Sequence, residues 1–165
     1  MARFLNQLRT EGLRSASFFA AYESNANTCN LNAMAEQFAE TFLAGGPQGS
    51  QAVRREDFLA FLPKRHQMLA AMGLREAWLT ALRETPAGPA HLLAETEWRM
   101  EMAGGAANKP PIEVTSTFLL ERAGESWRIL FYLAHDDLAA LVRERQAAAT
   151  GPSASDCPLP ESKVD

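Results

Sequence analysis

The chain has 165 residues, a formal net charge of −4 and a hydrophobic content of 47%. This length predicts one globular domain with enough chain for a real core. The negative charge and the lack of a basic stripe argue against a nucleic-acid binder. No apolar run approaches the roughly 20 residues of a membrane span, so the sequence predicts neither a nucleic-acid nor a membrane partner.

Cysteine usage indicates the compartment. Cys29 and Cys157 are far apart in the chain and fit neither a disulfide framework nor a zinc-ligand pattern. The N-terminus also lacks the uninterrupted apolar segment of a secretory signal. We therefore expect a cytoplasmic protein, and the sequence indicates no cofactor and no metal.

Hydrophobic spacing predicts two helices at the start of the chain. The first covers residues 3–25, with Gly12 dividing a loose extension from the helix proper. The second covers residues 31–43, with Asn30 as its N-cap. Its apolar stripe consists of Leu31, Met34, Ala35, Phe38 and Phe42.

A short strand over residues 51–54 and a third helix are predicted next. Asp57 is the expected N-cap of this helix, which reaches Met72 and ends at Gly73. Pro63 lies inside this stretch and should kink the helix or begin a second one.

Four strands follow, over residues 74–84, 91–102, 112–121 and 127–135. The second and third alternate between apolar and polar residues, which is the pattern of half-buried strands. The last is apolar on both faces: Leu130, Tyr132 and Ala134 lie opposite Ile129, Phe131 and Leu133. Helices can cover only one face, so we expect a homodimer through the sheet.

The polar face of these strands carries glutamates, and two interpretations remain open. Glu95, Glu97, Glu101 and Glu113 form either a solvated outer sheet face or, together with Arg99, part of a dimer rim. After the last strand, Asp136 is expected to cap a short helix. The predicted domain spans residues 1–146, and the polar segment 147–165 is predicted to be a disordered tail.

Helices, a short strand, a helix and then four strands make an α+β sandwich of sheet and helices. Three segments in this order resemble a known family: Phe18-Phe19-Ala20-Ala21-Tyr22, Phe42-Leu43-Ala44-Gly45-Gly46-Pro47, and Trp127-Arg128-Ile129-Leu130-Phe131-Tyr132 followed by His135-Asp136-Asp137. They are similar to the nuclear-transport-factor-2-like superfamily, with the SnoaL-like branch as the best match, over about residues 13–141.

This resemblance implies a cone-shaped, cystatin-like fold. A curved mixed or antiparallel sheet would wrap around three N-terminal helices, with a short C-terminal helix and an apolar pocket. Similar proteins include ketosteroid isomerases, polyketide cyclases, dehydratases and many non-catalytic scaffolds. One fold with many activities means that function must be argued from the site.

The isomerase site of that superfamily needs a carboxylate base, a tyrosine on the first helix and a protonated acid on a later strand. The resemblance places Arg55 at the base, Phe18 at the tyrosine and Ser116 at the acid, so all three functional types are missing and no catalytic residue is predicted. A shifted alignment would supply Glu56 or Asp57 as the base. The competing role for Asp57 is the helix N-cap.

The histidines and the two aspartates after the last strand are further candidates for a functional site. His135, Asp136 and Asp137 fit either a strand end with a helix cap or a small metal or acid–base site, in which at most two of them converge. His66 lies beside basic residues and is expected to be solvated, and His91 is expected to be exposed. No spacing supports a metal site built from three histidines.

The remaining candidate site is an apolar pocket inside the cone, which suits a small hydrophobic ligand. Its predicted lining is Tyr22, Phe38, Arg55, Asp57, Thr96, Trp98, Ser116 and Phe118, with Arg55 holding an anionic or carbonyl group. The alternative is that these side chains only fill the core.

Three functional hypotheses therefore remain open. The first is a dimeric, non-catalytic scaffold or binding module for a small hydrophobic ligand. The second is a cyclase, isomerase or dehydratase that uses the pocket. The third is a subunit that docks another protein on its sheet. An acid–base pair converging in a cavity favours the second, and a filled cone favours the first or third.

Overall fold

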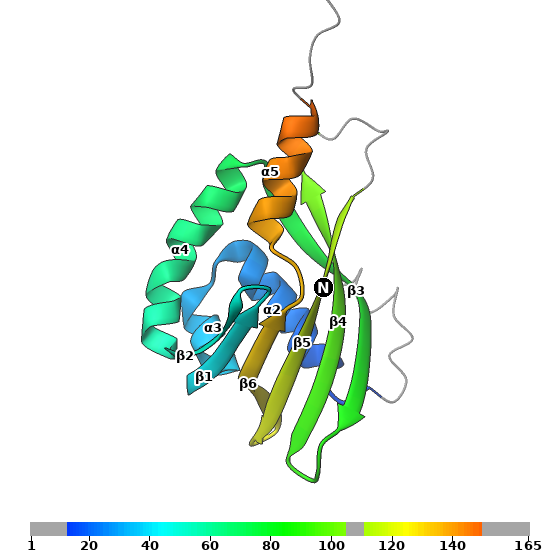
Figure 1. Cartoon of the computed structure of the whole chain (residues 1–165). Coiled ribbons are helices and arrows are strands. Elements are labelled where there is room, and N and C mark those ends of the chain that lie inside the picture. The colour runs from blue at the N-terminus through cyan, green and yellow to red at the C-terminus, as the bar shows by residue number, and fades with distance from the viewer. Residues whose placement is uncertain (1–12, 105–110, 150–165) are drawn as a thin grey trace, which may run out of the picture.

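The computed structural model describes residues 13–104 and 111–149. Its fold is α+β, as predicted: a curved, mixed sheet of six strands packs against the helices on its inner face (Figure 1). The helices are α2 (Ala16–Thr28), α3 (Leu31–Gln37), α4 (Arg55–Ala71) and α5 (Leu138–Ala149). Among the described residues, no helix is long and apolar enough to cross a membrane.

The sheet has the strand order β2-β1-β6-β5-β4-β3. The strands are β1 (Phe38–Gly46), β2 (Gly49–Arg54), β3 (Leu74–Pro86), β4 (His91–Met102), β5 (Ile112–Ala123) and β6 (Ser126–Ala134). Neighbours pair antiparallel except β1 and β6, which run parallel. The five predicted strands are confirmed to within a few residues at their ends, and β1 is an additional strand.

Strand β1 replaces the second half of a predicted helix, so the prediction of a helix over residues 31–43 is wrong. Its start is confirmed, because the side chain of Asn30 accepts a hydrogen bond from the backbone N–H of Ala33 at 3.2 Å. The helix ends at Gln37, and Phe38 pairs with Ile129 of β6. A spacing of four places Phe38 and Phe42 on one side of either a helix or a strand, and pairing with β6 selects the strand.

The predicted N-cap of the third helix is also wrong. Arg54 occupies the cap position of α4, and Asp57 is an exposed residue of the first turn. A carboxylate in the first turn still stabilises a helix through its dipole, which is why the residue type fits without capping. Helix α4 continues past Pro63 to Ala71, so Pro63 does not begin a second helix.

The cap of the last helix lies one residue later than predicted. Asp137 Oδ1 accepts a hydrogen bond from the N–H of Ala140 at 3.0 Å, whereas Asp136 Oδ2 accepts one from the N–H of Thr115 at 3.0 Å. Helix α5 extends to Ala149, beyond the predicted domain boundary at residue 146. The predicted first helix, over residues 3–25, is confirmed from Ala16 and continues to Thr28. Its residues 3–12 and the remainder of the predicted tail lie outside the described residues.

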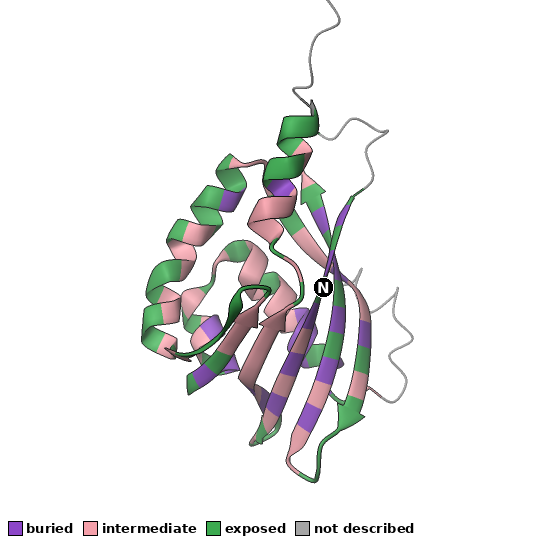
Figure 2. Ribbon diagram, in the orientation of Figure 1, coloured by how far each residue is buried: buried purple, intermediate pink, exposed green. Residues whose placement is uncertain are grey.

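The central strands separate an inner from an outer face, as Figure 2 shows by alternating buried and exposed positions on β4. In β6 a bulge changes the predicted alternation. Leu120 pairs with Ile129 and Leu119 with Phe131, so Leu130 is left without a partner. As a consequence Tyr132 faces inward on the same side as Ile129, and the predicted alternation of β6 is wrong at this point.

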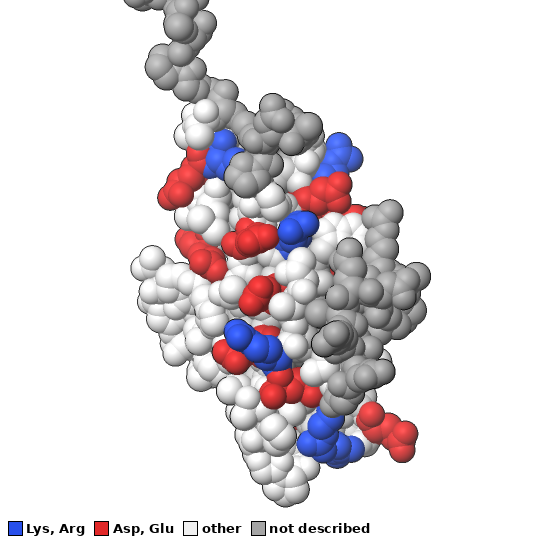
Figure 3. Space-filling view, turned by 90° about the vertical axis from the view of Figure 1, so that its right-hand side faces the viewer, with Lys and Arg blue, Asp and Glu red and all other residues white. Residues whose placement is uncertain are grey.

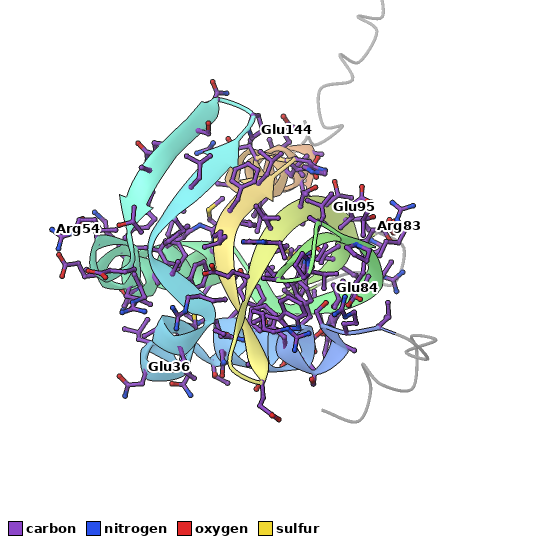
Figure 4. All side chains as sticks on the ribbon, turned by 90° about the horizontal axis from the view of Figure 1, so that it is seen from below. Glu36, Arg54, Arg83, Glu84, Glu95 and Glu144 are labelled. Atoms are coloured by element: carbon purple, nitrogen blue, oxygen red, sulfur yellow. The ribbon has the colours of Figure 1, made fainter. Side chains whose placement is uncertain are left out.

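The outer face has a charged half over β3, β4 and β5, where Figure 3 shows side chains of both signs. Arg83 lies 4.0 Å from Glu95, and Arg99 lies 3.5 Å from Glu113. Figure 4 shows Arg83 and Glu95 on the same outer side of the sheet. Glu84, the next residue of β3, turns toward α2 and accepts a hydrogen bond from the N–H of Ser15 at 2.6 Å.

Candidate functional site

A cavity of about 280 Å³ lies between the inner face of the sheet and helix α4. This volume is slightly below the range of ligand pockets, which is about 300 to 1,000 Å³. The wall is mostly apolar and includes Met34, Phe58, Leu62, Leu69 and Trp98. These side chains come from α3, α4 and β4, so the cavity is part of the domain interior.

The size of the inward side chains explains why the interior is open at this point. Residues of β4, β5 and β6 form rows across the sheet through their pairing. In one row the side chains are large and fully buried, and in another row, nearer the cavity, the side chains are small. The large row is Leu92, Leu120 and Ile129, and the small row is Thr96, Ser116 and Ala134. The small row leaves space that α4 does not fill.

Polar atoms within the small row are only partly satisfied. Trp98 Nε1 donates to Thr96 Oγ1 at 2.9 Å, and Thr96 Oγ1 donates to the carbonyl oxygen of Ser116 at 3.1 Å. The Thr96 hydroxyl is therefore used inside the sheet, and it fixes the indole of Trp98 against the wall. Ser116 is buried and lines the cavity, and its hydroxyl has no hydrogen bond to another described residue.

The eight residues predicted to line the pocket fall into two groups. Tyr22, Trp98, Ser116 and Phe118 line the cavity. Phe38, Arg55, Asp57 and Thr96 do not. The four that face the cavity belong to α2, β4 and β5, the elements whose inward faces the sequence pattern predicts best.

Arg55 has a structural role in place of the predicted ligand contact. Its Nη1 donates to the carbonyl oxygens of Ala35 and Phe38, both at 3.1 Å. The guanidinium thereby satisfies backbone acceptors where α3 gives way to β1. Phe38 is fully buried between the rings of Phe42 and Phe58, at centroid distances of 4.8 and 4.9 Å.

The sequence prediction missed Arg65 and Tyr132, which both line the cavity. Arg65 follows Phe58 and Leu62 at helical spacing on α4, and this shared face was the available signal. Tyr132 had no such signal, because only the bulge in β6 turns it inward.

Two tyrosines that line the cavity both pack against the ring of Phe118. The ring of Phe118 lies 5.6 Å from that of Tyr22 and 5.0 Å from that of Tyr132. Burial raises the pKa of the Tyr22 phenol, the nearby Tyr132 raises it further, and Arg65 opposes the shift. Tyr22 is therefore a neutral hydrogen-bond donor throughout the physiological range.

The histidines do not converge. His135 lies on the outer face, where its ring nitrogens contact the hydroxyls of Thr115 and Thr117 at 2.9 and 2.8 Å. His91 is 4.0 Å from Glu121, and His66 is exposed at the rim of the cavity. Within residues 13–104 and 111–149, no three His, Cys, Asp or Glu side chains are grouped as metal ligands.

Known proteins match this chain by structure and not by sequence. No family model matches it, and no curated protein matches it. It is similar to a protein of unknown function from Mycobacterium tuberculosis, with a TM-score of 0.61, 18% identity, and coverage of 92% of this chain and 97% of the other.

Two further solved structures show the same likeness. An NTF-2 like protein of unknown function from Shewanella oneidensis has a TM-score of 0.60 and 14% identity, covering 74% of this chain and 97% of the other. A candidate polyketide cyclase from Xanthomonas campestris has a TM-score of 0.50 and 16% identity, covering 79% and 95%. At such identities the likeness establishes the fold alone.

Proposed function

We propose that this protein, which has the nuclear-transport-factor-2-like cone fold, is a non-catalytic binding module for a small, mostly apolar ligand. The observation that carries the proposal is the row of Thr96, Ser116 and Ala134 beside the cavity. A core selected only for stability would fill this space, because close packing is the rule in protein interiors. The apolar wall with few hydroxyls suits a hydrophobic ligand.

The positions of the residues matched to an isomerase support a non-catalytic role. Phe18 is buried in the core, Arg55 is bonded to backbone carbonyls, and Asp57 is exposed away from the cavity. Proton transfer at an enolisable carbon requires a positioned base and an oxyanion donor together. The matched positions provide no such pair.

A cyclase, isomerase or dehydratase is the second candidate, and one observation favours it. Asp136 and His66 both line the cavity, so a carboxylate and an imidazole are present at its surface. Asp136 is held by the N–H of Thr115 at 3.0 Å. Turnover of an enolisable ketone that is abolished by Asp136→Asn and kept by Asp57→Asn would select this candidate.

The binding proposal is tested with tryptophan fluorescence. Trp98 lines the cavity, whereas Trp127 does not, and its Nε1 donates to the carbonyl oxygen of Arg14, ahead of α2. A neutral apolar probe such as naphthalene should quench the wild type saturably. Trp98→Phe should lose the quenching, and the control Trp127→Phe should keep it. Absence of saturable quenching in the wild type would reject the binding proposal.

We also propose that the protein is a homodimer through the apolar half of the outer face. This half consists of Leu43, Leu119, Phe131 and Leu133. Leu43 is 41% exposed, and Leu133 packs so closely over Gly45 that a Cβ there would lie 2.9 Å from it. Exposed apolar patches of this kind mark interfaces.

Sedimentation at micromolar concentration tests the dimer. Leu133→Glu should give monomers, and Glu97→Gln in the charged half should leave the dimer intact. A wild type that sediments as a monomer would reject the proposal.

We also propose that the protein is cytoplasmic, which the free thiol of Cys29 supports.

A further inference from the structure

The polar end of the cavity is built by two phenols that have no partner. Tyr22 belongs to α2 and Tyr132 to β6, and both line the cavity on either side of Phe118. Neither hydroxyl makes a hydrogen bond to another described residue. Among the described residues, Arg128 Nε is the buried side-chain nitrogen or oxygen that lacks a partner, so the two phenol hydroxyls are not sealed off and reach the space of the cavity. Both hydroxyls are therefore open to a ligand oxygen as a partner.

A cation lies at the same end. Arg65 of α4 is half-buried, lines the cavity and makes no ion pair with another described residue. It is also near enough to Tyr22 to act on the charge state of that phenol. A guanidinium and two phenols together offer several N–H and O–H donors, and a carboxylate is the small group that accepts from all of them.

The other ionisable groups of the cavity do not compete for this role. His66, Arg75 and Glu76 are exposed and lie at its rim, where the charges of Arg75 and Glu76 offset each other. Asp136 already accepts the N–H of Thr115. Arg55, which the sequence suggested as the cation, is bound to backbone carbonyls.

We infer that Tyr22, Tyr132 and Arg65 recognise the carboxylate of a small apolar monocarboxylic acid. The apolar body of this acid lies against Trp98 and Phe118, toward Leu62 of α4. This inference rests on the proposed binding function and specifies its ligand class. Because burial keeps Tyr22 neutral, its hydroxyl donates to an anion and does not repel it.

The test compares two probes of equal length, 4-phenylbutyrate and 4-phenylbutanol, by Trp98 fluorescence and calorimetry. The wild type should bind the acid at least about tenfold more tightly, which corresponds to one hydrogen bond to a charged group. Arg65→Gln should abolish this preference by weakening binding of the acid at least about tenfold more than binding of the alcohol. Tyr132→Phe and Tyr22→Phe should each reduce it.

The control is Arg75→Gln, which removes a rim cation of the same cavity and should keep the preference. Thermal melts confirm that each variant is folded, since all of these replacements are close in shape to the original. Equal affinity of the wild type for acid and alcohol would overturn the inference while leaving the binding function in place. Binding of neither probe, nor of naphthalene, would reject the binding function itself.

Discussion

The interior of this protein has two ends that differ in how they are filled. At the packed end, none of the inward side chains of Leu92, Leu120 and Ile129 is exposed, and Phe19 of α2 is likewise fully buried. At the open end, α4 faces the small row of Thr96, Ser116 and Ala134, and a cavity remains. The same three strands run through both ends, and the bulge in β6 falls between them.

The comparison indicates that side-chain size along β4, β5 and β6 contributes to where the cavity lies. Large residues in register fill the interior at one end, and small residues in register leave space at the other. The packed end supplies stability through buried apolar area. The open end gives up part of that stabilisation, which is the usual balance at functional sites.

The largest expected effect comes from emptying the packed end. The ring of Phe19 lies 5.1 Å from that of Phe118 and 5.2 Å from that of Phe18. Phe19→Ala should lower the free energy of unfolding by about 3–5 kcal/mol, through lost burial and a new cavity. The matched change at the open end, Leu62→Ala, should cost less than about 2 kcal/mol. Equal losses in urea denaturation would contradict the distinction between the two ends.

The second-largest expected effect comes from the hydrogen bonds that hold α2 to strand β3. The carboxamide of Asn27 donates to the carbonyl oxygen of Ala77 and accepts from its N–H, both at 2.9 Å. Strand β3 is an edge strand, so these bonds also occupy backbone groups that no neighbouring strand reaches. Asn27→Ala should cost about 1–3 kcal/mol because both groups lose their partner.

Asn27→Asp is the control for this prediction. It keeps the acceptor for the Ala77 N–H and loses the donor, so its loss in urea denaturation should lie between those of wild type and Asn27→Ala. If Asn27→Ala unfolds at the wild-type urea concentration, the side chain does not anchor α2.

A second comparison of the two ends adds atoms by replacing one of two alanines with leucine. Ala94 is fully buried, whereas Ala134 lines the cavity. Ala94→Leu should destabilise by about 1–3 kcal/mol because the added atoms overpack the core. Ala134→Leu should stay within about 1 kcal/mol of the wild type and abolish quenching by naphthalene. An Ala134→Leu protein that still binds naphthalene would show that the ligand lies elsewhere.

Local alternation was enough to predict most of the sheet. The inward faces of β4 and β5 follow a period of two without interruption, and Trp98, Ser116 and Phe118 could be placed at the cavity for that reason. Tyr22 was placed at the pocket as part of the segment Phe18–Tyr22, which resembles the cone-fold family.

Pairing between strands far apart in the sequence determines the features that local patterns did not predict. Residues 38–42 fit a helix and a strand equally well, and only the parallel pairing with β6 distinguishes them. Tyr132 faces inward because of a bulge in β6, and the local alternation of the sequence does not predict this bulge. Arg55 and Arg65 are similar in sequence context, but α4 presents only Arg65 to the cavity. Side-chain roles of this kind depend on how helix and sheet are placed relative to each other.

The smallest expected effect lies on α2, one residue after the cavity-lining Tyr22. The carboxylate of Glu23 accepts the N–H of Leu79 at 2.7 Å. Burial raises its pKa above the ordinary value of 4.5, the hydrogen bond opposes this shift, and Glu76 adds to it. A raised pKa in the folded state means that the protonated form is favoured there. Its contribution to stability is thus complete below about pH 4.5 and is lost as the pH rises through the folded pKa.

Glu23→Gln keeps an acceptor for Leu79 and removes the ionisation. Its free energy of unfolding relative to wild type should therefore be higher at pH 7 than at pH 4.5, by less than about 1 kcal/mol because solvent screens this half-exposed group. The control Glu97→Gln, which removes an exposed charge on the outer face, should show no such trend. A relative stability of Glu23→Gln that falls as the pH rises would mean that the hydrogen bond to Leu79 outweighs burial, and that α2 is held to β3 by an ionised carboxylate.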